Sequence, residues 1–342
     1  MSKLKTALLY IIAISCTLFP VTFAAEFTEG SLSASAANST HVSIIDLQSP
    51  DASEKFLESL RKTGFALFKN HGIDTTSLTK DWEEFYSSSD EYKMQKYFKN
   101  DPASNALGYY PYAAERAEGA AAQNKMEYYH DAAGHELPDC ISDETKSYFS
   151  DMETIKIQLS RMIDQEYAKE GFQLPERLRS QGIDSVEKMS QLNLHSSVVR
   201  ILHYPALAEA SDCIGEVVNL EHTDISAFSL LFATEPGLQL QARDGSWHGV
   251  GGGSDILVVN AGDMLMWGTD GHLPENRETG IKSTVHRVIR FSTRARFAFA
   301  AFFGVKPWIQ ILPEETALHA FNKRIGGNLT AAAEGESVTT SV

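Results

Sequence analysis

The second half of this chain consists of short apolar runs separated by glycine-rich turns, and this pattern restricts the possible folds more than any other feature. Each run has a length typical of a β-strand, and many carry β-branched or aromatic residues. Such a series predicts an antiparallel sandwich or jelly roll rather than a parallel α/β sheet. The expected strands are residues 198–204, 228–232, 238–241, 256–260, 264–267, 284–289 and 296–303.

The first half of the chain has a mixed pattern. Residues 42–47 and 64–69 read as strands, whereas residues 52–62 and 143–171 carry apolar side chains at helical spacing. We therefore predict a mainly β fold with flanking helices. The predicted division is a helical and mixed region over 42–195, a jelly-roll core over 196–310, and a C-terminal helix with a disordered tail over 311–342.

The N-terminus has the order of a secretory signal. Lys3 and Lys5 precede an apolar stretch over residues 7–23, which ends on small residues. We predict a signal peptide over 1–24, a linker over 25–41, and a location in the secretory pathway, either extracellular or periplasmic. The alternative is an N-terminal membrane anchor, but Pro20 and the shortness of the stretch argue against it. We expect no stable membrane span after signal cleavage.

The charge and the cysteine content argue against a nucleic-acid-binding protein, a disulfide scaffold and a cysteine zinc site. The chain has 30 Lys plus Arg against 45 Asp plus Glu, a formal net charge of -15, which repels phosphate backbones and argues against nucleic-acid binding. The cysteines are Cys16, Cys140 and Cys213, too few for a disulfide scaffold or a cysteine zinc site. After signal cleavage, Cys140 and Cys213 remain either as a disulfide or as two free thiols.

The candidate chemistry lies in the strand-rich half. His222 and Asp224 are two residues apart, so on one extended strand they would share a face. His286, on a later predicted strand, is the candidate third ligand. Two histidines and one carboxylate on one face of a coordination octahedron suit non-haem Fe(II), because they leave three adjacent positions for O2 and a chelating co-substrate. Zinc accepts the same ligands but has no redox chemistry.

These motifs resemble the isopenicillin-N-synthase-like family of Fe(II)/2-oxoglutarate-dependent dioxygenases. The resemblance covers roughly residues 42 to 308 and includes segments in both halves. The matching segments are Ile44-Ile45-Asp46-Leu47, Gly64-Phe65, Asn70-His71-Gly72-Ile73, Gly108-Tyr109, Arg200-Ile201-Leu202-His203-Tyr204-Pro205, Glu221-His222-Thr223-Asp224, Val259-Asn260-Ala261-Gly262-Asp263 and Ser283-Thr284-Val285-His286-Arg287-Val288.

The resemblance implies a distorted double-stranded β-helix, that is, a jelly roll. It also implies that His222, Asp224 and His286 hold Fe(II), that Arg296 grips the distal carboxylate of 2-oxoglutarate, and that Tyr204 supports this carboxylate. A guanidinium suits the task because its planar fork pairs with a carboxylate. The implied reaction consumes O2 and 2-oxoglutarate, releases succinate and CO2, and hydroxylates or desaturates a small-molecule substrate. Ascorbate is a candidate additional reductant.

Two positions depart from the family pattern. The family usually has Ser two residues after its co-substrate arginine, and this chain has Ala298. The interval between Asp224 and His286 is also long, and we expect the extra residues over 272–281, in a loop near the mouth of the site. If the strand register is shifted, Arg294 is the alternative carboxylate anchor. Two other functions remain open, namely an iron oxidase that does not use 2-oxoglutarate and a non-catalytic jelly-roll binding protein.

The remaining histidines, arginines and phenylalanines have simpler interpretations. We expect His71 to be a structural residue in a turn and His203 to face away from Tyr204 into packing. His248 and His272 are expected on the surface or in loops, and Arg287 and Arg290 in ion pairs on the sheet surface. A phenylalanine cluster is expected in the core rather than at the substrate; it contains Phe297, Phe299, Phe302 and Phe303.

Overall fold

The computed structural model describes residues 42–98, 108–111, 126–131, 137–193, 196–207, 213–251, 253 and 255–325. The predicted signal peptide, the linker and the tail from Gly326 lie outside these residues. Within the described part of the chain, no helix combines the length and the apolar character that a bilayer span requires.

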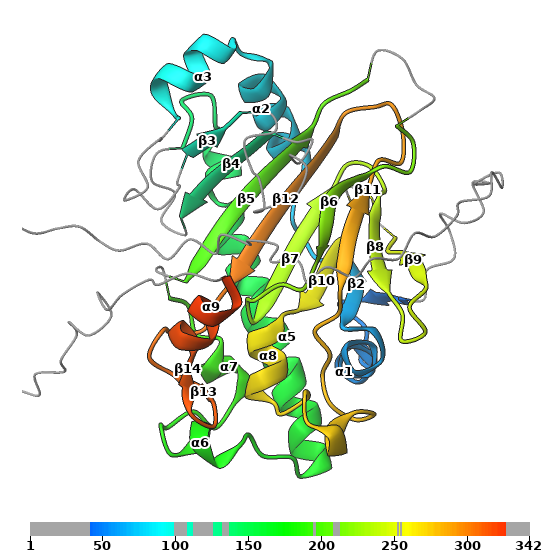
Figure 1. Ribbon diagram of the computed structural model, residues 1–342, viewed down its shortest axis with the longest axis vertical. Coiled ribbons are helices and arrows are strands. Elements are labelled where there is room, and N and C mark those ends of the chain that lie inside the picture. The colour runs from blue at the N-terminus through cyan, green and yellow to red at the C-terminus, as the bar shows by residue number, and fades with distance from the viewer. Residues whose placement is uncertain are drawn as a thin grey trace, which may run out of the picture.

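Two β-sheets form the centre of the molecule (Figure 1). The eight-stranded sheet has the order β1-β2-β10-β7-β12-β5-β4-β3, and the four-stranded sheet has the order β6-β11-β8-β9. The larger sheet contains β1 (Ile44–Asp46), β2 (Phe65–Lys69), β3 (Gly108–Tyr110), β4 (Met126–Asp131), β5 (Ser197–Tyr204), β7 (Phe228–Ala233), β10 (Leu257–Ala261) and β12 (Arg296–Phe303). The smaller sheet contains β6 (Val217–His222), β8 (Leu238–Gln241), β9 (Trp247–Gly249) and β11 (His286–Ile289), and β13 (Gln310–Leu312) pairs with β14 (Glu315–Thr316).

Helices cover the outer face of the larger sheet and the ends of the sandwich. Two longer helices, α1 (Ala52–Thr63) and α5 (Tyr148–Glu170), pack against each other, and both end at a glycine in the left-handed conformation, Gly64 and Gly171. The other helices are α2 (Thr76–Ser87), α3 (Asp90–Lys96), α4 (Asp143–Lys146), α6 (Glu176–Arg179), α7 (Val186–Met189), α8 (Asp263–Gly268), the 3-10 turn η3 (Pro274–Asn276) and α9 (Ala317–Ile325).

The central strands alternate between two environments, as the period of a β-strand requires. Along β12, the even-numbered residues from Arg296 to Phe302 line a cavity between the two sheets. The odd-numbered residues face the helices: the Tyr148 hydroxyl on α5 donates to the backbone carbonyl of Phe299, and the rings of Phe149 and Phe303 are 5.3 Å apart. The core therefore lies between the larger sheet and the helices, and the cavity lies on the opposite face.

Most of the elements predicted from the sequence are present. Residues 264–267 were expected as a strand but belong to helix α8, so that prediction is wrong. Strands β3, β4, β6, β9, β13 and β14 were not predicted. The strands of the first half do not form a separate layer, because β2 pairs antiparallel with β10 and β4 pairs antiparallel with β5. Segments on both sides of the boundary near residue 195 thus share one sheet.

Candidate functional site

The candidate site is the cavity between the two sheets. Both sheets contribute side chains to it, and the floor is formed by the inward-facing residues of β5, β7 and β12. The lining residues are Phe65, Arg200, Leu202, Tyr204, Asn219, His222, Asp224, Ser229, Leu231, Leu238, Asn260, His286, Val288, Arg296, Ala298, Ala300 and Phe302. All five residues that the sequence proposed for metal and co-substrate are in this set.

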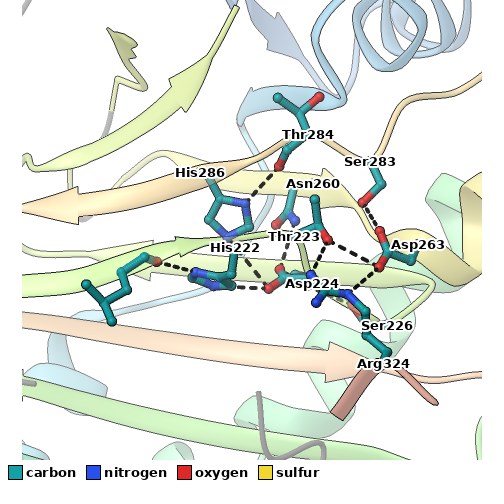
Figure 2. A network of polar contacts seen from close by, with 12 residues as sticks. His222, Thr223, Asp224, Ser226, Asn260, Asp263, Ser283, Thr284, His286 and Arg324 are labelled. Carbon is teal, nitrogen blue, oxygen red and sulfur yellow. Dashed lines mark hydrogen bonds and ion pairs between the residues drawn. The ribbon is translucent and has the colours of Figure 1, made fainter. Parts of the chain in front are cut away.

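Three of these residues form a compact cluster of metal-binding atoms (Figure 2). One ligand atom each from His222, Asp224 and His286 lies within 4.8 Å of the other two. Asp224 Oδ1 is 3.6 Å from Nε2 of both histidines, and all three side chains are buried. The histidines meet because they are directly paired across β6 and β11, and paired residues of an antiparallel ladder point to the same face.

Backbone carbonyls orient both imidazoles. The Nδ1 atom of His222 lies 2.6 Å from the carbonyl oxygen of Leu220, and Nδ1 of His286 lies 3.0 Å from that of Thr284. A carbonyl oxygen only accepts, so Nδ1 carries the proton in each ring and Nε2 keeps its lone pair. This tautomer is the one that a metal ligand needs, and the hydrogen bonds also fix the direction of each ring.

Asp224 is held as an ionised ligand by two further polar residues. Its Oδ2 accepts a hydrogen bond from Ser229 Oγ at 2.5 Å and another from Asn260 Nδ2 at 2.8 Å, which leaves Oδ1 facing the histidines. Burial opposes ionisation, but His286, His222 and the two hydrogen bonds together lower the pKa of Asp224 below its usual value. The donor set of two imidazole nitrogens and one carboxylate therefore fits Fe(II).

His222 and Asp224 lie close together for a reason other than the one predicted from the sequence. We expected His222 and Asp224 to share a face of one strand, but β6 ends at His222 and Asp224 lies in the segment that follows. The Asp224 carbonyl accepts a hydrogen bond from the backbone NH of Asp263 at 2.7 Å, so contact with α8, rather than strand geometry, places this residue. The predicted meeting of His222 with His286 across strands is confirmed.

A buried guanidinium faces the same cavity. Arg296 is only 6% exposed and its Nε donates to the carbonyl oxygen of Glu235 at 3.0 Å, whereas Nη1 is buried without a hydrogen-bond partner among the described residues. Tyr204 is paired with Arg296 across β5 and β12, and the Arg296 Cζ lies 5.1 Å from the centre of the Tyr204 ring. Burial lowers the pKa of Arg296, but an arginine remains charged.

The Nη1 donor of Arg296 fits a carboxylate, because a buried donor without an acceptor is costly and an anion would complete the hydrogen bonding of the guanidinium. Ala298 lies beside Arg296 on the same face and offers no polar atom. Arg294 is not an alternative anchor: it is exposed and its Nη2 pairs with Glu235 Oε2 at 3.0 Å. Residues 272–281 are not among the residues that line the cavity, so their place near its mouth stays a prediction.

Two family models match this chain. The model described as "2OG-Fe(II) oxygenase superfamily" matches residues 195–305, and the model described as "non-haem dioxygenase in morphine synthesis N-terminal" matches residues 42–147. Together they include β1 and β2, the three metal-binding side chains and Arg296. The chain belongs to the 2OG-Fe(II) oxygenase superfamily.

Individual relatives agree with this membership. Gibberellin 2-beta-dioxygenase 2 of Arabidopsis thaliana is 23% identical over 292 residues, which is 80% of this chain and 79% of the relative. Clavatol oxidase of Penicillium crustosum is 38% identical over 112 residues, which is 31% of this chain and 30% of the relative. A crystal structure from Shewanella oneidensis, described as an oxygenase, superposes with a TM-score of 0.66 at 27% identity and covers 83% of this chain and 97% of that protein. The jelly-roll prediction is confirmed.

Sequence reasoning missed the polar residues that support the ligands of this oxygenase. Ser229 and Asn260 orient Asp224, and Asp263 contacts the segments on either side of the cluster. A signal was present, because a Ser or Asn within an apolar strand is buried and must find a hydrogen-bond partner. The sequence does not show which residue that partner is.

The simpler interpretations of several residues hold in this oxygenase. The ring nitrogens of His71 are hydrogen-bonded to the backbone at Asp255 and Ile73, and His203 stacks on Phe297 outside the cavity. His272 is exposed, and Arg287 forms its predicted ion pair, with Glu221 at 3.1 Å.

The expectations for Arg290 and Phe302 are wrong, and the structure distinguishes between the two states proposed for the cysteines. Arg290 is buried and donates to the carbonyl oxygen of Pro205 instead of lying on the sheet surface. Phe302 lines the cavity, whereas the other three phenylalanines face the helices, because its even position on β12 points inward. Cys140 and Cys213 are free thiols in the structure.

Proposed function

We propose that this protein is an Fe(II)- and 2-oxoglutarate-dependent dioxygenase that hydroxylates or desaturates a small organic molecule, with release of succinate and CO2. One observation carries the proposal: the His222, Asp224 and His286 cluster and the unpaired Nη1 of Arg296 face the same buried cavity. The superfamily membership agrees with it. A non-catalytic binding protein would not need both features.

The side chains have separate tasks in this proposal. The histidines present Nε2 lone pairs, and Asp224 presents Oδ1 while Ser229 and Asn260 hold its other oxygen. Arg296 receives the distal carboxylate of 2-oxoglutarate, with Tyr204 beside it. When bound, Fe(II) supplies the redox chemistry that couples O2 reduction and 2-oxoglutarate decarboxylation to substrate oxidation.

The cavity walls also contribute to the chemistry. Leu202, Leu231, Leu238 and Val288 surround the polar groups and exclude bulk water. In such surroundings the attraction between the Arg296 guanidinium and a carboxylate is stronger than in water. Because Arg296 and the three metal-binding side chains line the same cavity, a chelating co-substrate can bind in only one orientation, with its distal carboxylate at Arg296.

The proposal is tested by anaerobic titration of the Fe(II)-loaded protein with 2-oxoglutarate, followed through the metal-to-ligand absorption band. We expect saturable binding, and on admission of O2 we expect succinate formation that a screen of small-molecule substrates accelerates. His286→Ala should lose the band and the succinate while it keeps the fold, and His272→Ala, an exposed histidine, should behave as the wild type.

The two alternatives give different results. O2 consumption without 2-oxoglutarate binding would indicate the iron oxidase. Absence of Fe(II) binding, or full Fe(II) occupancy in the His286→Ala protein, would contradict the proposed metal centre.

A further inference from the structure

The two segments that carry the metal ligands meet at one carboxylate. Asp263, the first residue of α8, accepts a hydrogen bond from Ser283 Oγ at 2.6 Å through Oδ1 and one from Thr223 Oγ1 at 3.2 Å through Oδ2. Thr223 lies between His222 and Asp224, and Ser283 lies on the segment that leads into His286. Figure 2 shows Asp263 beside the metal-binding side chains, with the hydroxyls of Thr223 and Ser283 directed at it.

The backbone at the start of α8 is bonded directly to the loop that carries Asp224. The NH groups of Gly262, Asp263 and Met264 donate to the carbonyl oxygens of Ala227, Asp224 and Ser226, respectively. A Cβ atom on Gly262 would lie 2.1 Å from the Ser226 oxygen and 2.7 Å from the Asp224 oxygen. The start of α8 and the loop that carries Asp224 therefore form one tightly packed unit.

The C-terminal helix reaches this unit through Arg324. Its Nη2 donates to Thr223 Oγ1 at 3.1 Å, and its Nε lies 3.6 Å from Asp263 Oδ2. The Thr223 hydroxyl accepts from Arg324 and donates to Asp263, so the direction of each hydrogen bond is determined. Both oxygens of Asp263 are thus acceptors, one toward each metal-bearing segment.

We propose that Asp263 is a positioning residue that sets the spacing between the His222–Asp224 loop and the His286 segment, and that Arg324 fixes its orientation. The inference rests on the proposed function, because it assigns Asp263 to the metal affinity of that site. Polar groups that support metal ligands commonly change metal affinity ten- to a hundredfold when they are removed.

If Asp263 only stabilised the fold, its removal would lower stability without changing metal affinity. An acidic residue in the first turn of a helix stabilises that helix through its dipole, and this role would affect stability alone. The oxygens of Asp263, however, accept hydrogen bonds from hydroxyls of two other segments. Metal affinity therefore distinguishes the two roles.

The test is Asp263→Asn, which keeps the shape and replaces one acceptor by a donor. We expect Fe(II) and Co(II) to bind about ten- to a hundredfold more weakly than to the wild type, with an altered Co(II) visible spectrum. Asp81→Asn is the matched control, because Asp81 is also buried and also accepts a hydrogen bond from a serine hydroxyl, that of Ser142 at 2.6 Å, but Ser142 lies at the start of α4 and not on a segment that carries a metal ligand. It should lose stability without a change in metal affinity.

Smaller changes keep the test decisive if Asp263→Asn does not fold. Thr223→Val and Ser283→Ala each remove one hydroxyl, and each should weaken Co(II) binding; Arg324→Lys should weaken it less than Arg324→Met. Wild-type metal affinity and an unchanged Co(II) spectrum in these variants would overturn the inference. A wild-type protein that binds neither metal would instead contradict the proposed function, so the two failures are distinguishable.

Discussion

At the residue scale, Arg296 is a buried guanidinium with one unpaired donor, and a carboxylate is an acceptor that also matches its charge. Arg296→Gln should weaken 2-oxoglutarate binding about thirtyfold or more, because loss of a buried charge partner costs about 2–5 kcal/mol. Arg294→Gln makes the same change at an exposed position and should leave the affinity unchanged. Anaerobic titration of the iron-loaded variants measures both. Equal affinities in the two variants would remove Arg296 from the co-substrate site.

Ala298 gives the same titration a second use. Its direct partners across the sheet are Leu202 and Ala233, and neither carries a hydroxyl that could replace the one that the family pattern places here. Ala298→Ser would add a donor near the carboxylate, and a hydrogen bond to a charged group contributes about 1.5–3 kcal/mol. We expect 2-oxoglutarate to bind about tenfold more tightly. Unchanged or weaker binding would show that this face does not contact the carboxylate.

The residue types of the cluster were predictable from the sequence, but their supporting shell was not. His222, Asp224, His286, Arg296 and Tyr204 follow from a short motif and a resemblance, and all line one cavity. Their supports depend on distant contacts: Thr223 and Asp263 are 40 residues apart. Hydrogen bonds of this kind are determined by how strands and helices pack, which local patterns do not contain.

At the scale of elements, the strands were predictable where one face is consistently apolar. Strand β12 has the predicted limits because every residue in it is buried. Residues 264–267 were misread because periodicity in a run this short does not separate a strand from a buried helix turn. Strand β6 was missed because Asn219 and His222, which face the cavity, interrupt its apolar pattern.

The start of helix α8 supplies a prediction at this scale. Gly262→Ala places a Cβ against the backbone oxygens of Asp224 and Ser226, which cannot rotate away. We expect the free energy of unfolding to fall by about 1–3 kcal/mol, as for overpacked cores, and metal binding to weaken. Gly268→Ala in the same helix meets mainly the flexible end of Met189, so it should lose less. Urea denaturation measures both variants, and equal losses would show that the loop is not tightly held.

At the scale of the whole molecule, the larger sheet is built from segments that are far apart in the sequence. Strand β2 lies beside β10, and β5 lies between β12 and β4, so both halves of the chain form the surface that carries the site. Sequence patterns located these strands individually, but strand order depends on long-range pairing. The helices α2 and α5 then cover the outer face, where Tyr86 and Tyr148 donate to the carbonyl oxygens of Ile201 and Phe299.

This covered face gives the molecule a pH-dependent stability. His203 stacks on Phe297 with ring centres 4.4 Å apart and contacts Tyr86, and its Nδ1 has no hydrogen-bond partner among the described residues. Burial, with a smaller contribution from the nearby charge of Lys93, lowers the pKa of His203 to about 4. An unfolded histidine has a pKa of about 6.5, so between these values the unfolded chain binds a proton that the native state does not.

Stability should therefore decrease as the pH falls below about 6.5, and His203 should account for about 2 kcal/mol of the loss between pH 7 and pH 5. His203→Phe keeps the stacked ring and removes the titrating group, so this part of the loss should disappear. Urea denaturation of the metal-free wild type and variant at both pH values measures the difference. Because the two proteins differ only at this position, comparison of their pH dependence isolates His203. The same pH dependence in both proteins would show that His203 is protonated as readily in the native state as in the unfolded chain.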